Sequence, residues 1–147
     1  MKDVVIDIVT EQFGDGDDRD LMEFSTDGEY IFDGESGCFS YMESELTGLE
    51  GTRTSVAVTP GEIVVDREGC VTGRMIFREG TKTSFLYDTP YGAAMLGIDT
   101  RKIKHSFNEQ GGSLEIDYVV NMEHTIVSRN IFKINITEQK REQQWQI

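Results

Sequence analysis

Hydrophobic and polar side chains alternate with a period of two along most of this chain. Near its start, Val4, Ile6 and Ile8 fall on one face of an extended backbone, and Asp7 falls on the other. This period is typical of a β-strand that buries one face. The pattern recurs, with short interruptions, at 22–30, 39–43, 53–58, 62–66, 71–77, 83–88, 93–107, 114–120 and 126–136. No segment before Thr137 carries the 3.6-residue stripe of an amphipathic helix, so the pattern predicts an all-β chain.

Short stretches rich in glycine, aspartate and proline separate these segments. They lie at 13–18, 59–61, 68–69, 78–80, 89–92 and 110–112, and a further turn is expected at 121–124. Such stretches are typical of hairpins, which join successive strands into an up-and-down meander. A meander of about eight to ten strands favours a closed barrel, because closure removes the two exposed sheet edges.

Glycines inside the predicted strands favour the barrel over a two-sheet sandwich, which is the alternative. Gly28, Gly73 and Gly97 suit the bends that the strands of a small barrel need. We therefore predict a single domain at 1–138, folded as a closed antiparallel up-and-down β-barrel. A polar tail or short helix is expected at 139–147.

The charge balance excludes some classes of partner. With 27 acidic and 14 basic residues, the chain carries a formal net charge of −13. No stripe of lysine or arginine offsets this charge, and the surface repels the phosphates of nucleic acids and of anionic bilayers. We expect neither a nucleic-acid nor a membrane partner, and solubility is the simplest explanation of the acidity.

The apolar runs and the cysteines bear on the compartment. Runs such as Val4–Ile6 and Ile63–Val65 fall far short of the ~20 apolar residues of a spanning helix, and the first residues lack the order of a secretion signal. Cys38 and Cys70 are separated, as is typical of reduced cysteines. The expected location is the cytoplasm.

A series of short motifs carries a family resemblance. The motifs are, in order, Phe24-x-Thr26-x-Gly28-x-Tyr30, Tyr41-x-Glu43, Thr54, Glu68-Gly69, Phe77-x-x-Gly80, Tyr87-x-Thr89-Pro90-x-Gly92, Thr100, Gly111-Gly112-x-Leu114 and Tyr118. In this order the chain resembles the YwiB-like family of bacterial proteins, from about Val4 to about Thr137. The resemblance implies a calycin or lipocalin-like barrel. It implies no activity and no catalytic residues, because that family is a domain of unknown function.

Several polar side chains share a face with the apolar residues that would fill the barrel. Glu43 shares one with Phe39 and Tyr41, and Tyr118 shares one with Ile116. A barrel of this size either fills with side chains or leaves room for one small ligand. The candidate lumen residues are Tyr30, Tyr41, Glu43, Thr54, Arg74, Tyr87 and Tyr118.

Glu43 is the most informative of these candidates. A buried carboxylate must be paired, hydrogen-bonded or neutralised. Arg53 and Arg74 are the candidate cations, although alternation puts Arg53 on the face opposite Thr54. One interpretation leaves Glu43 near the barrel mouth, solvated or bonded to tyrosine hydroxyls.

The other interpretation makes Glu43 a ligand contact. Glu43 and Tyr41 would anchor the polar head of a ligand, and its apolar part would contact Phe24, Met75 and Phe77. On this interpretation Glu43→Gln weakens ligand binding and leaves the fold intact.

No metal or cofactor site is predicted. Asp15–Asp20 departs from the calcium-loop order at Arg19 and has no glutamate at the required spacing. His105 and His124 each lack a second ligand at i+2 or i+4. The motifs of phosphate loops, dinucleotide folds and serine hydrolases are absent from the sequence.

Three functions stay open. The first is a cytoplasmic barrel that binds a small molecule in its lumen, by analogy with the use of related barrels. The second is a non-catalytic interaction or structural module with a side-chain-filled lumen, with a homodimer as one form of it. The third is an enzyme that uses Glu43 and tyrosines, and it ranks last because no pair of base and nucleophile is visible.

Overall fold

All regular secondary structure in the described residues is β-strand. The computed structural model describes residues 2–14, 19–123 and 125–139. The strands are β1 (Lys2–Phe13), β2 (Arg19–Phe32), β3 (Gly37–Met42), β4 (Arg53–Thr59), β5 (Glu62–Glu68), β6 (Gly73–Phe77), β7 (Lys82–Thr89), β8 (Gly92–Asn108), β9 (Gly111–Met122) and β10 (Thr125–Glu138). The all-β prediction is confirmed. The predicted tail lies outside the described residues, apart from Gln139.

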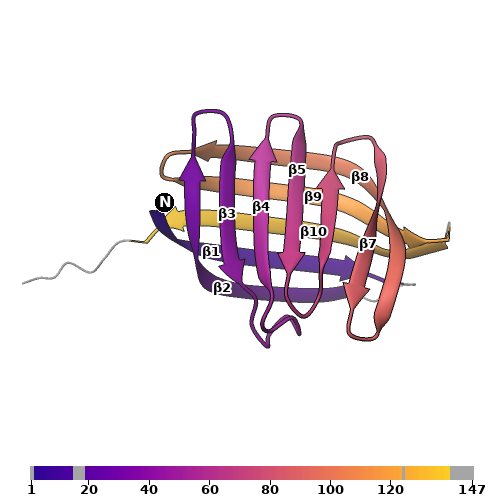
Figure 1. Cartoon of the computed structure of the whole chain (residues 1–147). Helices are drawn as coiled ribbons and strands as arrows, with labels where there is room; N and C mark the ends of the chain where they lie inside the picture. The colour runs from indigo at the N-terminus through magenta and orange to yellow at the C-terminus, as the bar shows by residue number, and fades with distance from the viewer. Residues whose placement is uncertain (1, 15–18, 124, 140–147) are drawn as a thin grey trace, which may run out of the picture.

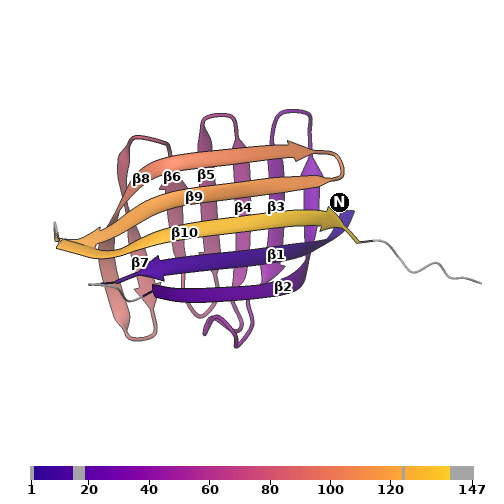
Figure 2. The ribbon, with the colours of Figure 1, turned by 180° about the vertical axis from the view of Figure 1, so that it is seen from behind.

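The strands form one continuous antiparallel sheet. Its order is β6-β5-β4-β3-β2-β1-β10-β9-β8-β7 in a sheet of 10 strands, so consecutive strands pair except β6 and β7, which form the two ends, and β1 also pairs with β10. Figures 1 and 2 show two layers around one interior. The front layer holds β3 to β7. The strands of the back layer (β1, β2, β9, β10 and most of β8) run across those of the front layer.

β2 and β8 each pass from one layer to the other at a glycine that the sequence singled out. β2 pairs with β1 as far as Tyr30 but with β3 only from Glu29 onward, so the change falls next to Gly28. A side chain at Gly28 would clash with Ile6 and with the Ser40 carbonyl. β8 begins to pair with β9 at Gly97, where a side chain would clash with Asn121. These two glycines therefore permit the corners of the barrel.

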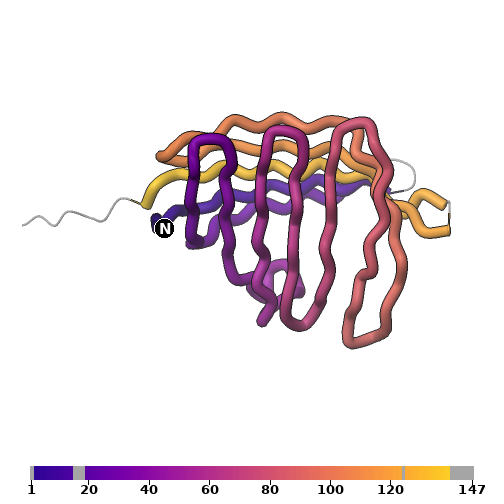
Figure 3. Tube along the Cα trace, turned by 45° about the horizontal axis from the view of Figure 1, so that its top comes forward, coloured from indigo at the N-terminus to yellow at the C-terminus, as the bar shows by residue number. Residues whose placement is uncertain are grey.

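Closure between the two ends of the sheet rests on a few bonds instead of a full ladder. Thr72 and Asp88 form an isolated bridge, and Thr83 Oγ1 donates to the Ile76 carbonyl at 2.8 Å. Because β6 spans only Gly73–Phe77, it is too short to pair along the whole of β7. The predicted barrel is confirmed, with the refinement that it is nearly closed. Figure 3 shows the path of the chain through the successive hairpins of the barrel.

The interior is packed by the apolar faces that alternation predicted. Val4, Ile6 and Ile8 of β1 are buried, as are the matching positions of the other strands. The largest fully buried side chains are Tyr30, Phe39 and Phe77. Among the described residues we find no helix with the length and apolar character needed to cross a membrane.

Candidate functional site

Two rows of polar side chains, one in each layer, face the interior. The front polar row is Tyr41, Thr54 and Arg67, which are cross-strand neighbours on β3, β4 and β5. The back polar row is Tyr118, Asn130 and Gln12, which are neighbours on β9, β10 and β1. Residues in register share a face of the sheet, so each row presents its side chains to one side.

A cavity of about 280 Å³ lies between these rows. Its polar lining is Thr10, Glu11, Gln12, Tyr41, Glu43, Thr47, Arg67, Tyr118 and Asn130, and its apolar lining is Ile8, Met22, Phe24, Leu49, Ile131 and Phe132. Glu43, Thr47 and Leu49 belong to the connection between β3 and β4, which we call the 43–52 loop. Gly48 and Gly51 take φ values of +77° and +88° in this loop, a conformation that favours glycine. The loop thus forms one wall of the cavity.

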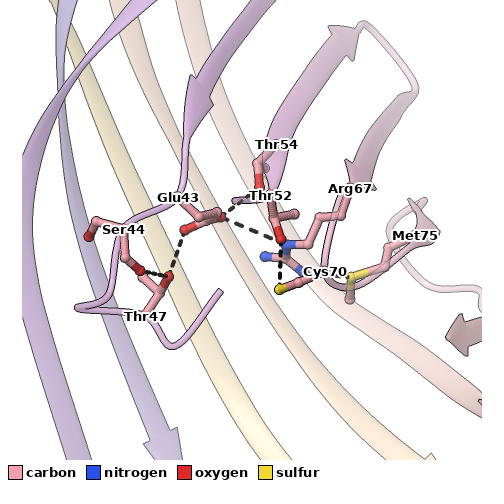
Figure 4. A network of polar contacts seen from close by, with 8 residues as sticks. All are labelled: Glu43, Ser44, Thr47, Thr52, Thr54, Arg67, Cys70 and Met75. Carbon is pink, nitrogen blue, oxygen red and sulfur yellow. Dashed lines mark hydrogen bonds and ion pairs between the residues drawn. The ribbon is translucent and has the colours of Figure 1, made fainter. Parts of the chain in front are cut away.

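Glu43 follows directly after β3 and is the centre of a hydrogen-bond network (Figure 4). Its side chain is only 2% exposed. Thr47 Oγ1 donates to Glu43 Oε1 at 2.9 Å, and Thr54 Oγ1 donates to Glu43 Oε2 at 2.6 Å. The backbone N–H of Glu43 donates to the Thr52 carbonyl at 2.8 Å. Glu43 therefore ties the 43–52 loop to β4, and threonine hydroxyls bond its carboxylate.

Arg67 is the cation nearest to this carboxylate. Its Nε lies 3.9 Å from Glu43 Oε2, and its side chain is 21% exposed. Its Nη1 lies 3.7 Å from Met75 Sδ. The Nε atom is fully buried and makes no hydrogen bond to any described residue. A donor in this state costs about 1–3 kcal/mol unless something satisfies it.

Two phenols complete the polar part of the cavity. Burial, and after it the negative charge of Glu43, raises the pKa of the Tyr41 hydroxyl. Burial also raises the pKa of the Tyr118 hydroxyl, and the charge of Arg67 offsets part of this effect. Both phenols are therefore protonated donors at neutral pH. The Tyr118 ring meets Phe77 edge-on at 4.9 Å, and its hydroxyl has no hydrogen-bond partner in the described part of the chain.

The structure brings four of the predicted lumen residues together: Tyr41, Glu43, Thr54 and Tyr118. Tyr30 is also buried in the interior but lies outside this cavity. Its hydroxyl donates to the Asn108 carbonyl at 2.6 Å.

The other predicted residues lie elsewhere. Tyr87 packs against Phe85 at 6.1 Å and does not line the cavity. Arg74 is 68% exposed on the outer face and pairs with Asp66 at 3.4 Å, so it is not a lumen residue. Of the predicted apolar contacts, Phe24 lines the cavity, whereas Met75 and Phe77 pack behind Arg67 and Tyr118.

The sequence analysis missed Arg67, although the signal was present. In β5, Arg67 continues the buried series Ile63 and Val65 at every second position. The same rule finds Asn130, which continues the series of Ile134 and Ile136 in β10. Both are polar residues at positions that alternation assigns to the interior.

The cavity offers hydrogen-bonding groups and two carboxylates that already have partners, Glu43 with two threonines and Glu11 with Arg19. Within 2–14, 19–123 and 125–139, no group of three His, Cys, Asp or Glu side chains is placed to hold a metal ion. Asp15–Asp18 and His124, which the sequence analysis considered as metal ligands, lie outside the described residues. Among the described groups that line the cavity, the Arg67 Nε is a buried donor without a hydrogen-bond partner.

Comparisons with known proteins agree with this fold. A family model described as "Domain of unknown function (DUF1934)" matches residues 6–134. The chain is 30% identical over 104 residues to the "Uncharacterized beta-barrel protein YwiB" of Bacillus subtilis (strain 168), covering 71% of this chain and 72% of that protein. The crystal structure of the ywiB protein from Bacillus subtilis superposes with a TM-score of 0.84 at 24% identity, covering 95% of this chain and 93% of that one. The resemblance predicted from the motifs is confirmed, and the chain belongs to the DUF1934 family, whose function is unknown.

Proposed function

We propose that this barrel binds a small molecule in the cavity between its two polar rows. One observation carries the proposal: Arg67, whose buried Nε makes no hydrogen bond to a described residue, and Tyr118 line the same cavity of about 280 Å³. Buried donors are normally hydrogen-bonded, and those that are not require an explanation. A ligand that accepts from the Arg67 guanidinium supplies one.

The shape of the cavity supports a ligand of limited size. Its volume of about 280 Å³ is just below the ~300–1,000 Å³ of sites for drug-sized molecules. In this proposal Glu43 is a positioning residue, because its carboxylate oxygens already accept from Thr47 and Thr54.

The test uses a variant that fills the cavity and a matched variant that does not. Thr10 lines the cavity, and Val9 points to the outer face of the same strand. Thr10→Phe should occupy the space, whereas Val9→Phe adds the same side chain outside. We expect native mass spectrometry to find an added small mass on the wild type and on Val9→Phe, and the bare chain for Thr10→Phe.

The same measurement is repeated after incubation with a protein-free extract of small metabolites, so that a cargo lost in purification can rebind. A wild type that carries no added mass in either condition would contradict the proposal. So would a Thr10→Phe variant that carries the same mass as the wild type.

A second candidate is the non-catalytic interaction module, and an exposed apolar pair favours it. Leu86 of β7 and Met95 of β8 are cross-strand neighbours that are 53% and 60% exposed. Tyr91, in the connection between these strands, is fully exposed. For this candidate we expect the mass in solution to rise with protein concentration, and Leu86→Lys to abolish the rise. A mass that stays at one chain over the whole range would exclude self-association.

A further inference from the structure

Two of the polar residues that line the cavity, Arg67 and Tyr118, have a definite polarity. Arg67 can only donate, and the Tyr118 phenol, protonated at neutral pH, has a proton to donate. Next to Tyr118 in register is Asn130, whose Nδ2 already donates to Ser128 Oγ at 3.0 Å. The carbonyl oxygen of Asn130 is therefore the end of this amide that is left to accept. The cavity thus combines two donors with a neighbouring acceptor.

The charges of the cavity cancel. Arg67 Nε lies 3.9 Å from Glu43 Oε2, and Glu11 is paired with Arg19 at 3.6 Å. A ligand carboxylate would enter beside Glu43 in a chain of net charge −13, and a ligand ammonium would meet Arg67. Either charge would lose part of its hydration without a free counter-charge, which disfavours a charged ligand. The balance favours an uncharged ligand.

The aromatic side chains that line the cavity favour a ligand with an aromatic ring. Phe24 and Phe132 line the cavity together with the rings of Tyr41 and Tyr118. These four side chains come from β2, β10, β3 and β9, and thus from both layers of the barrel. Aromatic groups pack well against one another in offset or edge-to-face arrangements. A flat, aromatic molecule can make more extensive contact with these four rings than a branched aliphatic one.

We infer that the cavity is selective for an uncharged aromatic molecule that carries an amide-type edge, with a carbonyl oxygen beside an N–H. The inference rests on the proposed binding function and specifies its ligand class. The carbonyl oxygen accepts from Arg67 and Tyr118, the N–H donates to Asn130, and the ring lies against Phe24 and Phe132. Carboxamides and lactams on an aromatic ring have this chemistry.

A matched series of probes tests the class. Benzamide, benzoate, benzylamine and ethylbenzene share one ring and differ only in the attached group, which is an amide, an anion, a cation at neutral pH or a hydrocarbon. Each is titrated into the full-length protein, and binding is followed by chemical-shift changes in protein NMR spectra. We expect benzamide to bind most tightly, by about tenfold or more over the two charged probes, because burying an unpaired charge costs more than burying an amide.

Matched variants test the contact. Tyr118→Phe removes one donor that has no protein partner, and we expect it to weaken benzamide binding about three- to tenfold, the usual worth of one hydrogen bond. The same variant should leave ethylbenzene binding unchanged. Tyr87→Phe makes the same replacement on a side chain that does not line the cavity, and it should bind all four probes as the wild type does.

The outcomes separate this inference from the proposed function. If no probe binds the wild type, the ligand class is overturned, whereas the proposed function is decided by the native mass spectra. If the probes bind but benzoate, benzylamine or ethylbenzene is as tight as benzamide, binding stands and the ligand class is overturned. The class is also overturned if Tyr118→Phe binds benzamide as tightly as Tyr87→Phe does.

Discussion

The two ends of the barrel interior are built from the same strands and differ by one step in register. Phe39, Val56 and Val65 are cross-strand neighbours on β3, β4 and β5 and are buried in the core. The next inward row, two residues away on each strand and nearer the 43–52 loop, is Tyr41, Thr54 and Arg67. We call these regions the packed end and the cavity end. Their difference shows that one alternating pattern builds either a packed core or a cavity lined by polar groups, according to the residues that fill one register row.

The largest expected effect separates the two ends by their packing. Phe39 is 1% exposed and lies at the packed end, so Phe39→Ala should lower the free energy of unfolding by about 3–5 kcal/mol. Phe24 is half-buried and already borders a cavity, so Phe24→Ala should cost about half as much or less. Urea unfolding of both variants measures the difference. Equal losses would mean that the cavity end is packed as tightly as the other end.

Glu43 should carry the next largest effect, because it is a buried charge at the cavity end. Glu43→Gln weakens the hydrogen bonds from two threonines and removes the counter-charge of Arg67. We expect a loss of about 2–3 kcal/mol in the free energy of unfolding. This expectation differs from the sequence-based hypothesis, in which the same substitution left the fold intact.

A surface pair supplies the control for Glu43. Glu29 is 47% exposed and pairs with Arg53 at 3.4 Å, so Glu29→Gln should change stability by less than about 1 kcal/mol. The double variant Glu43→Gln with Arg67→Met should recover part of the loss, since it leaves no unpaired guanidinium. If Glu43→Gln is as mild as Glu29→Gln, Glu43 does not hold the 43–52 loop.

High pH should distinguish the buried phenols from the rest of the molecule. The folded pKa values of Tyr30, Tyr41 and Tyr118 lie above the ordinary value of 10.0. The folded state then holds these protons more tightly than the unfolded state does. Their contribution is complete below pH 10 and is lost as pH rises through each folded pKa, at about 1.4 kcal/mol per pH unit for each phenol.

Removing one of these phenols should make the alkaline loss shallower. Tyr41→Phe no longer titrates at this position, so its free energy of unfolding should fall less steeply above pH 10 than that of the wild type. Unfolding curves at a series of alkaline pH values give both slopes. Parallel slopes would show that Tyr41 gains no proton affinity on folding.

Much of this architecture could be predicted from the sequence. Alternation predicted the strands and their inward faces, and Gly28 and Gly97 marked the corners because no side chain fits there. Alternation also selected Tyr41, Glu43 and Tyr118, which the structure places around one cavity.

The rest depends on register, which a single sequence does not specify. Nothing in the sequence alone indicates that Tyr118 pairs with Asn130, or that Arg67 and Thr54 lie side by side. Arg74 was chosen as a lumen cation in place of Arg67, although only Arg67 is in phase with the buried Ile63 and Val65. In β6, alternation places Arg74 on the face opposite the buried Met75 and Phe77.

The smallest effects are expected from removing one hydroxyl oxygen at each of two tyrosines, Tyr30 and Tyr118. The Tyr30 hydroxyl donates to the Asn108 carbonyl at 2.6 Å, so Tyr30→Phe should cost about 0.5–1.5 kcal/mol of stability. The Tyr118 hydroxyl has no partner among the described residues, so Tyr118→Phe breaks no bond within the protein and should be neutral or slightly stabilising in the ligand-free protein. Thermal unfolding with and without benzamide separates the cases, because only Tyr118→Phe should reduce the stabilisation that benzamide gives. A loss in the ligand-free protein as large as that of Tyr30→Phe would mean that Tyr118 serves the fold, and the distinction between the two ends would then fail.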